Sequence, residues 1–230
     1  MRILVTGANG FLGNYLIPEL LKRKYEVIAT GKGKCRIKVT DTFVYEEMDF
    51  TNVQSVNHVF STYKPEVIVH AGAISKPDEC EENRELAFDI NTQGTINLLK
   101  AAIPLNSFFI FFFFFFVFDG LKVMYNEKDS PSPVNYYRQT KLLAEEKVKE
   151  YVGEWCIVRT VLVYGRPQMG RENLLTLVKK KNENGEVFKV FTDQLRTPTY
   201  VEDLASAIIS IIDNKANGIF HISGVDQLSP

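Results

Sequence analysis

The sequence predicts an α/β protein with a Rossmann-type, doubly wound parallel sheet, and three observations support this prediction. A short apolar strand, residues 3–5, runs directly into three glycines spaced three residues apart, and an amphipathic helical pattern follows at once. Further along the chain, apolar strand patterns alternate with helical patterns, which is typical of a parallel sheet with helices on both faces. The chain has 230 residues, of which 45% are hydrophobic, enough for one sizeable core plus part of a second unit.

The glycines Gly7, Gly10 and Gly13 indicate a dinucleotide-binding turn. Glycine lets the backbone turn sharply and approach a pyrophosphate closely, and the N-terminus of the following helix offers free N–H groups and a partial positive charge. The spacing is Gly-x-x-Gly-x-x-Gly rather than Gly-x-Gly-x-x-Gly. A glycine-rich turn that serves only helix packing is the alternative interpretation.

The remaining elements follow in order along the chain. Strand patterns cover residues 26–29, 43–48, 66–70 and 156–159, and a very hydrophobic strand precedes a polar loop at 122–135. Helical patterns cover residues 52–63, 81–103 and 137–151. We therefore expect a dinucleotide-binding domain over residues 1–165. Residues 166–230 are expected to form a small, truncated C-terminal substrate-binding region whose chain crosses back to the core.

Charge and cysteine content exclude several classes of protein. The formal net charge of −1 shows no basic excess for nucleic acid. The cysteines Cys35, Cys80 and Cys156 are odd in number and far apart, so they form neither a metal-binding spacing nor a disulfide framework, and no metal site is expected. The chain leads directly into a strand without a signal peptide. We therefore expect a cytoplasmic protein with no membrane association.

A second chemical signal is the pair Tyr137 and Lys141. Residues four apart share a face of a helix, so the phenol and the ammonium can point into one site. A nearby cation stabilises phenolate and lowers the pKa of the tyrosine, which can then act as a general acid toward a carbonyl that is being reduced. The alternative is an exposed helical pair without catalytic meaning.

The segment after the second strand bears on cofactor choice. Proteins that prefer NAD place an acidic residue there to bind the ribose 2′-hydroxyl. This chain has no acid in residues 30–34 but has Lys32 and Lys34, whose charges can meet a 2′-phosphate. We therefore predict NADP (NADPH) as the preferred cofactor, with NAD possible. A solvated loop is the alternative.

Motifs along essentially the whole chain resemble the extended short-chain dehydrogenase/reductases, and within them the dTDP-4-dehydrorhamnose reductases. The matching segments occur in the family's order, at residues 6–13, 64–73, 91–95, 117–120, 133–141, 159–165 and 200–205. Beyond the three glycines and the two lysines, the resemblance implies that the cofactor is bound by Asn9, Phe11, Leu12, Asp49, Phe50, Ala71, Gly72, Ala73, Asn91, Tyr137 and Lys141.

The resemblance also implies an activity, the NADPH-dependent reduction of the 4-keto group of a nucleotide-linked deoxysugar. In that reaction Tyr137 gives its proton to the keto oxygen, and Lys141 lowers the tyrosine pKa and holds the nicotinamide ribose. Pairing through the helices at 81–103 and 137–151 as a homodimer is implied as well. The alternative function is of a different class. The regulatory beta subunit of methionine adenosyltransferase resembles this reductase, so the chain can be a dinucleotide-binding partner without catalysis.

Three departures from the reductase pattern stand out. Residues 111–116 are all phenylalanine, and matching backward from Val117 places Phe113, Phe114 and Phe115 where the reductases have Ser, Thr and Asp. Phenylalanine cannot donate a hydrogen bond to the substrate carbonyl, so we expect impaired reduction. The alternative interpretations of this run are an ordinary buried strand and a segment that is not the natural sequence. In addition, Arg138 replaces a small residue and is expected to crowd the nicotinamide, and the reductases continue beyond the end of this chain.

Overall fold

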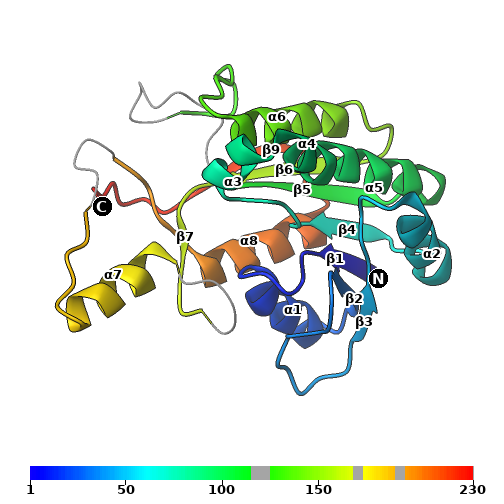
Figure 1. Ribbon diagram of the computed structural model, residues 1–230. Helices are drawn as coiled ribbons and strands as arrows, with labels where there is room; N and C mark the ends of the chain where they lie inside the picture. The colour runs from blue at the N-terminus through cyan, green and yellow to red at the C-terminus, as the bar shows by residue number, and fades with distance from the viewer. Residues whose placement is uncertain (115–124, 168–172, 190–194, 230) are drawn as a thin grey trace.

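The structure is a computed structural model that describes residues 1–114, 125–167, 173–189 and 195–229. Its centre is a seven-stranded parallel sheet in the order β3-β2-β1-β4-β5-β6-β9, with helices on both faces (Figure 1). The strand order reverses between β1 and β4, which is the point where doubly wound sheets bind ligands. The predicted Rossmann-type fold is thus confirmed. The strands of this sheet are β1 (Arg2–Thr6), β2 (Glu26–Gly31), β3 (Val44–Glu47), β4 (Val67–His70), β5 (Phe108–Phe114), β6 (Trp155–Thr160) and β9 (Gly218–Ile222).

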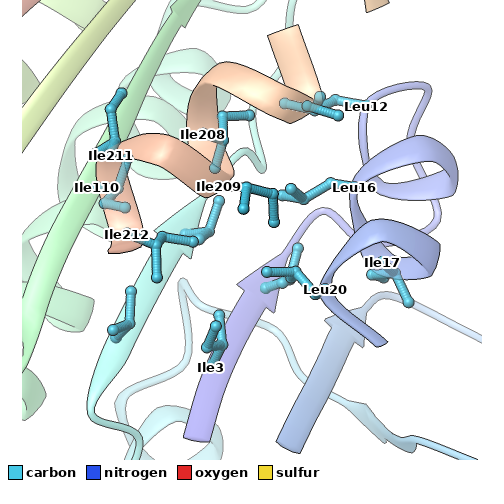
Figure 2. Packing of buried hydrophobic residues seen from close by; sticks show 14 of the residues in the cluster. Ile3, Leu12, Leu16, Ile17, Leu20, Ile110, Ile208, Ile209, Ile211 and Ile212 are labelled. Carbon is cyan, nitrogen blue, oxygen red and sulfur yellow. The ribbon is translucent and has the colours of Figure 1, made fainter. Parts of the chain in front are cut away.

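Two helices, α1 (Gly13–Lys22) and α8 (Val201–Asn214), cover one face of the sheet. Figure 2 shows Leu16 and Leu20 of α1 pointing toward Ile209 of α8, above Ile3 of β1. Each of these side chains is at most 4% exposed. Fully burying a side chain of this size stabilises the fold by about 1.5–3 kcal/mol, so this layer holds the helix that follows the glycine turn.

The other face is covered by α2 (Val53–Tyr63), α5 (Gly94–Ala102) and α6 (Tyr136–Lys149). The helix predicted at residues 81–103 is wrong as a single element. It is divided into α3 (Pro77–Glu82), α4 (Arg84–Phe88), a π-helical turn (Asp89–Gln93), α5 and a 3₁₀ turn (Ile103–Leu105). The first break falls at Asn83, whose side chain accepts a hydrogen bond from the backbone N–H of Leu86 and so starts α4 as a new helix.

Strand β5 contains the described part of the phenylalanine run. Residues 108–113 are at most 3% exposed, as expected for a central strand buried on both faces. Successive side chains alternate between the two helical layers. Phe112 belongs to the core under α1 and α8, whereas Phe111 belongs to the core under α5 and α6. Phe115 and Phe116 lie outside the described residues.

The C-terminal part of the chain adds a small second sheet. Its two parallel strands are β7 (Val163–Tyr164) and β8 (Thr199–Tyr200), and α7 (Leu174–Glu183) has no buried residue. The chain then returns to the main sheet through α8 and β9, which pairs with β6. The domain boundary at residue 165 stays a prediction. None of the helices in the described parts of the chain is long and apolar enough to cross a membrane.

Candidate cofactor and active site

The glycine turn lies at the carboxyl end of β1 and packs on the segment that follows β4. Gly7 has φ +67°, and a Cβ atom on it would lie 2.8 Å from the Cα of Gly72 and 3.0 Å from the carbonyl carbon of Ala71. A side chain at this position would therefore push the two segments apart. Residues 7–13 and 71–73, which were predicted to share one cofactor, are brought together in the structure. The turn fits a pyrophosphate, because it leads directly into the positive end of α1, which begins at Gly13.

Two hydrophobic residues of this turn, Phe11 and Leu12, have different surroundings. Leu12 is 4% exposed and packs in the core with α8, so it has only its backbone to offer a ligand. Phe11 is partly exposed and makes an edge-to-face contact with Tyr15, with ring centroids 5.6 Å apart.

Lys32 and Asp49, both predicted to bind the cofactor, form an ion pair with each other. The Nζ atom of Lys32 lies 2.8 Å from Oδ2 of Asp49, and the side chains are 60% and 39% exposed. Partial burial of Asp49 acts to raise its pKa, but hydrogen bonds from Lys32 and Thr51 hold that pKa below its usual value. Exposed pairs of this kind contribute about 1 kcal/mol or less, so the pair can open for a ligand.

The loop that carries Lys32 and Lys34 is held by Asn9 of the glycine turn. Its side chain donates to the carbonyl of Lys34 at 3.1 Å and accepts from the backbone N–H of Arg36 at 2.8 Å. Sequence reasoning missed Arg36, which adds a further exposed cation to this loop. The signal was present, because Arg36 continues the same basic run two residues beyond Lys34.

Tyr137 and Lys141 lie in the first turns of α6 and are buried. The helix starts at Asn135, whose side chain accepts from the backbone N–H of Arg138 at 2.9 Å. Tyr137 donates its hydroxyl to the carbonyl of Phe114 at 2.9 Å, and the Nζ atom of Lys141 lies 3.8 Å from the ring centroid of Phe111. They are 0% and 1% exposed, which excludes the alternative of an exposed helical pair.

Burial moves both pKa values away from their usual range. It raises the pKa of Tyr137, with the Cys80 thiol adding to the effect and Arg138 opposing it. It lowers the pKa of Lys141 to about 7, against the opposing charge of Glu145. The expectation of a lowered tyrosine pKa is therefore wrong for this structure, because desolvation of the phenolate outweighs every nearby charge.

The two described phenylalanines in the Ser and Thr positions have separate roles. Phe113 is fully buried and meets the Tyr137 ring edge-on, at 6.3 Å between centroids and 82° between planes. The Phe114 ring instead stacks with Phe112 on the opposite side of the sheet, and only its carbonyl reaches Tyr137. Phe113 is thus the described residue whose side chain occupies the expected donor position. Phe115, the third expected position, lies outside the described residues.

Asn91 and His70 connect the surroundings of the site. Asn91, in the π-helical turn, accepts from the Ile74 N–H at 3.0 Å and donates to the Thr140 hydroxyl at 3.1 Å, so it ties the segment after β4 to α6. His70 is fully buried, with its ring nitrogens 2.7 and 3.0 Å from the hydroxyls of Thr6 and Thr95. Burial, aided by the charge of Lys141, holds the pKa of His70 well below its usual value. Both side chains thus connect neighbouring segments, and cofactor binding by Asn91 stays a prediction.

Phe50 contacts this network from the segment after β3. Its ring lies 5.3 Å from that of His70 in an edge-on arrangement, and its carbonyl accepts from the Asn97 side chain at 3.1 Å.

A cavity of about 490 Å³ lies elsewhere, in the C-terminal part, and neither Tyr137 nor Lys141 lines it. Its walls include residues of β7, α7 and β8. The described residues contain no group of three or more His, Cys, Asp or Glu side chains that could hold a metal ion.

Comparison with known proteins agrees with this geometry. The whole chain, residues 1–230, matches the family described as RmlD substrate binding domain. The chain belongs to this family. Among solved structures, a dTDP-4-dehydrorhamnose reductase from Bacillus anthracis in complex with NADP is 30% identical with a TM-score of 0.86, over 99% of this chain and 76% of that chain. A dTDP-4-dehydrorhamnose reductase from Clostridium acetobutylicum is 32% identical with a TM-score of 0.86, over 100% of this chain and 76% of that chain.

Curated proteins similar to this chain include a methionine adenosyltransferase beta subunit, the second predicted class of function. Methionine adenosyltransferase 2 subunit beta from Rattus norvegicus is 30% identical over 234 residues, which is 99% of this chain and 68% of that protein. The spore coat polysaccharide biosynthesis protein SpsK from Bacillus subtilis is 31% identical over 223 residues, which is 96% of this chain and 73% of that protein. The resemblance to the dTDP-4-dehydrorhamnose reductases, predicted from the motifs, is confirmed, and with it the oxidoreductase family.

Proposed function

We propose that this chain binds NADP and belongs to a reductase that acts on the 4-keto group of a nucleotide-linked deoxysugar. The observation that carries the proposal is the placement of Tyr137 and Lys141. Both are buried beside the C-terminal half of β5, at the same edge of the parallel sheet as the glycine turn. Bound NADPH supplies the hydride in such a reduction. Relatives of known structure include a dTDP-4-dehydrorhamnose reductase in complex with NADP, which supports the choice of substrate and cofactor.

Each residue has a specific task in this reaction. Tyr137 gives its phenolic proton to the keto oxygen as the carbonyl is reduced, which requires its hydroxyl to leave the carbonyl of Phe114. Lys141, with a pKa of about 7, changes charge near neutral pH and stabilises the resulting phenolate. The glycine turn holds the pyrophosphate, and the basic loop holds the 2′-phosphate.

We propose further that the phenylalanine run impairs the reaction but leaves cofactor binding intact. Phe113 puts a ring against Tyr137 where a hydroxyl donor to the substrate is expected. Losing one such donor costs roughly 10²–10³ in rate. We expect Phe113→Ser to raise NADPH consumption with dTDP-4-dehydrorhamnose far more than it changes NADPH affinity. Phe114→Thr is the matched control, because its side chain lies on the opposite face of the sheet. Turnover of the unchanged chain at an ordinary enzyme rate would contradict this proposal.

The preference for NADP over NAD rests on the basic loop. Titration calorimetry with each cofactor is expected to show tighter binding of NADP, and Lys32→Ala combined with Lys34→Ala is expected to remove most of that difference. The physical reason is loss of charge facing the 2′-phosphate, so NAD binding should change little. Equal affinity of the unchanged chain for the two cofactors would contradict the preference.

A non-catalytic regulatory subunit is the second candidate function. The ring of Phe113 in the site and the 30% identity to methionine adenosyltransferase 2 subunit beta favour it. The same assay separates the two. If the Phe113→Ser chain folds and binds NADPH yet consumes none with dTDP-4-dehydrorhamnose, the regulatory function is favoured.

Assembly and compartment complete the proposal. We propose that two copies pair through the exposed apolar residues of α4 and α6 to form a homodimer. All three cysteines are unpaired, with Cys80 and Cys156 buried and Cys35 exposed, which supports a reducing cytoplasm. Nucleic acid and membranes are not proposed as partners.

A further inference from the structure

The loop after β2, residues 31–36, concentrates positive charge beside the glycine turn. Lys32 is paired with Asp49 at 2.8 Å. Lys34 and Arg36 are exposed, and neither forms an ion pair with another residue in the described ranges. Free cations on a loop are effective toward a phosphate only when the backbone that carries them has a defined shape, because ordering a loop costs about 1–2 kcal/mol per residue.

Two side chains define the shape of this loop. Tyr45, in β3, donates its hydroxyl to the carbonyl of Gly33 at 2.7 Å and accepts from the Asn9 side chain at 2.8 Å. Asn9 also binds the carbonyl of Lys34 at 3.1 Å and the N–H of Arg36 at 2.8 Å. The glycine turn, the loop and β3 are thereby joined through a clamp, which we define as Asn9 and Tyr45.

The sequence leaves space for this clamp at Gly31. A Cβ atom at Gly31 would lie 3.2 Å from the Tyr45 hydroxyl oxygen and 3.3 Å from Nδ2 of Asn9. Such contacts are tight, so a Cβ atom there would require the two clamp side chains to shift by a few tenths of an ångström. On the far side, the N–H of Gly33 donates to Glu47 at 2.9 Å, and Gly33 has φ +71°, so the turn itself favours glycine.

We propose that Tyr45 is a positioning residue for cofactor selectivity, and that the clamp holds the loop in the shape that presents Lys34 and Arg36 to the 2′-phosphate of NADP. The inference rests on the proposed preference for NADP. Tyr45 acts through the loop backbone and touches neither the substrate nor the reacting atoms. Because NAD lacks the 2′-phosphate, loosening the loop weakens NADP binding selectively.

The test is titration of the whole chain with NADP and with NAD, separately, by calorimetry. Tyr45→Phe removes both hydrogen bonds of the hydroxyl but keeps the ring. We expect the dissociation constant for NADP to rise about tenfold, which corresponds to about 1.4 kcal/mol, while that for NAD changes by about twofold or less. Gly31→Ala, which displaces the clamp by a different route, is expected to act in the same direction. Tyr63→Phe is the matched control, because its hydroxyl donates to Glu46 at 2.9 Å outside the loop.

The outcomes separate this inference from the proposed function. If the unchanged chain prefers NADP but Tyr45→Phe and Gly31→Ala keep the same ratio of NADP to NAD affinity, the positioning role of Tyr45 is overturned and the preference stands. An equal loss of both affinities overturns it too, since that indicates general damage to the fold. If the unchanged chain binds both cofactors equally, the proposed preference fails and the inference fails with it.

Discussion

The amine of Lys141 is a buried titratable group of the candidate site. It is 1% exposed and lies over the ring of Phe111, and burial lowers its pKa to about 7. In the unfolded chain the same amine keeps a pKa near its ordinary value of 10.5. Between these two values the unfolded state binds more protons than the folded state, so folding stability must rise with pH over that window.

We expect the free energy of unfolding to increase from pH 7 to pH 9 in the unchanged chain, and to increase less in Lys141→Met. At pH 7, Lys141→Met should be more stable by roughly 1–3 kcal/mol, because it removes a buried group that resists charging. Urea denaturation at both pH values measures this. Lys22→Met is the control, since Lys22 is exposed and paired with Glu19. Comparing the pH dependence of the three proteins separates the contribution of Lys141 from that of groups they all share. One such group is the Cys80 thiol, whose pKa is raised to about 11 by burial. If the free energy of unfolding depends on pH in the same way in all three proteins, the Lys141 amine stays charged in the folded chain.

At the scale of elements, a buried ion pair attaches α6 to the sheet. Arg159 of β6 donates to Glu145 of α6 through two bonds of 2.6 and 2.9 Å, and the side chains are 1% and 0% exposed. Burial acts to raise the pKa of Glu145, but the bonds from Arg159 and Lys149 hold it below its usual value. Glu145 lies one turn beyond Lys141, so this pair sets where the proposed catalytic side chains of α6 stand relative to β6.

Removing one partner of this pair should cost far more than removing an exposed pair. We expect Arg159→Met to lower the free energy of unfolding by about 3–5 kcal/mol, because Glu145 is left buried without its main partner. Arg23→Met, which breaks the exposed pair with Asp213, is expected to cost about 1 kcal/mol or less. Urea denaturation of both variants provides the comparison. If the two substitutions lower the free energy of unfolding by similar amounts, Lys149 and water replace Arg159 as partners of Glu145.

At the scale of the whole molecule, apolar side chains remain exposed on two neighbouring helices. Leu86 and Phe88 of α4 are 42% and 36% exposed, and Leu143 of α6 is 44% exposed. Helices α4 and α6 contact each other and lie close together in Figure 1. Exposed apolar area of this kind marks a surface for association.

We expect light scattering to give the mass of a homodimer, and we expect Leu86→Lys combined with Leu143→Lys to give a monomer. The physical reason is that a lysine at each position would carry charge into the proposed contact. Leu175→Lys on α7 is the control, because this residue is 56% exposed but lies away from α4 and α6. A monomeric mass for the unchanged chain at working concentration would refute the dimer.

The strand–turn–helix at the start of the chain and the alternation of strands and helices were predictable because both are local patterns. Three glycines after an apolar strand define the turn whatever surrounds them. The break in the helix predicted at residues 81–103 was less predictable, because it depends on the Asn83 side chain, which accepts from the Leu86 N–H and starts a new helix. The family was also predictable, because its motifs keep their order along the chain.

Sequence by itself therefore determined the fold class, the glycine turn and the pair Tyr137 and Lys141. Tertiary structure decided how these parts act together. Asp49 meets Lys32 and Tyr45 meets Asn9 only because β1, β2 and β3 are neighbours in the sheet. Alternation along a buried strand turns Phe113 toward Tyr137 and Phe114 away. The direction of each pKa shift likewise follows from burial, a property of the packed molecule that residue spacing does not carry.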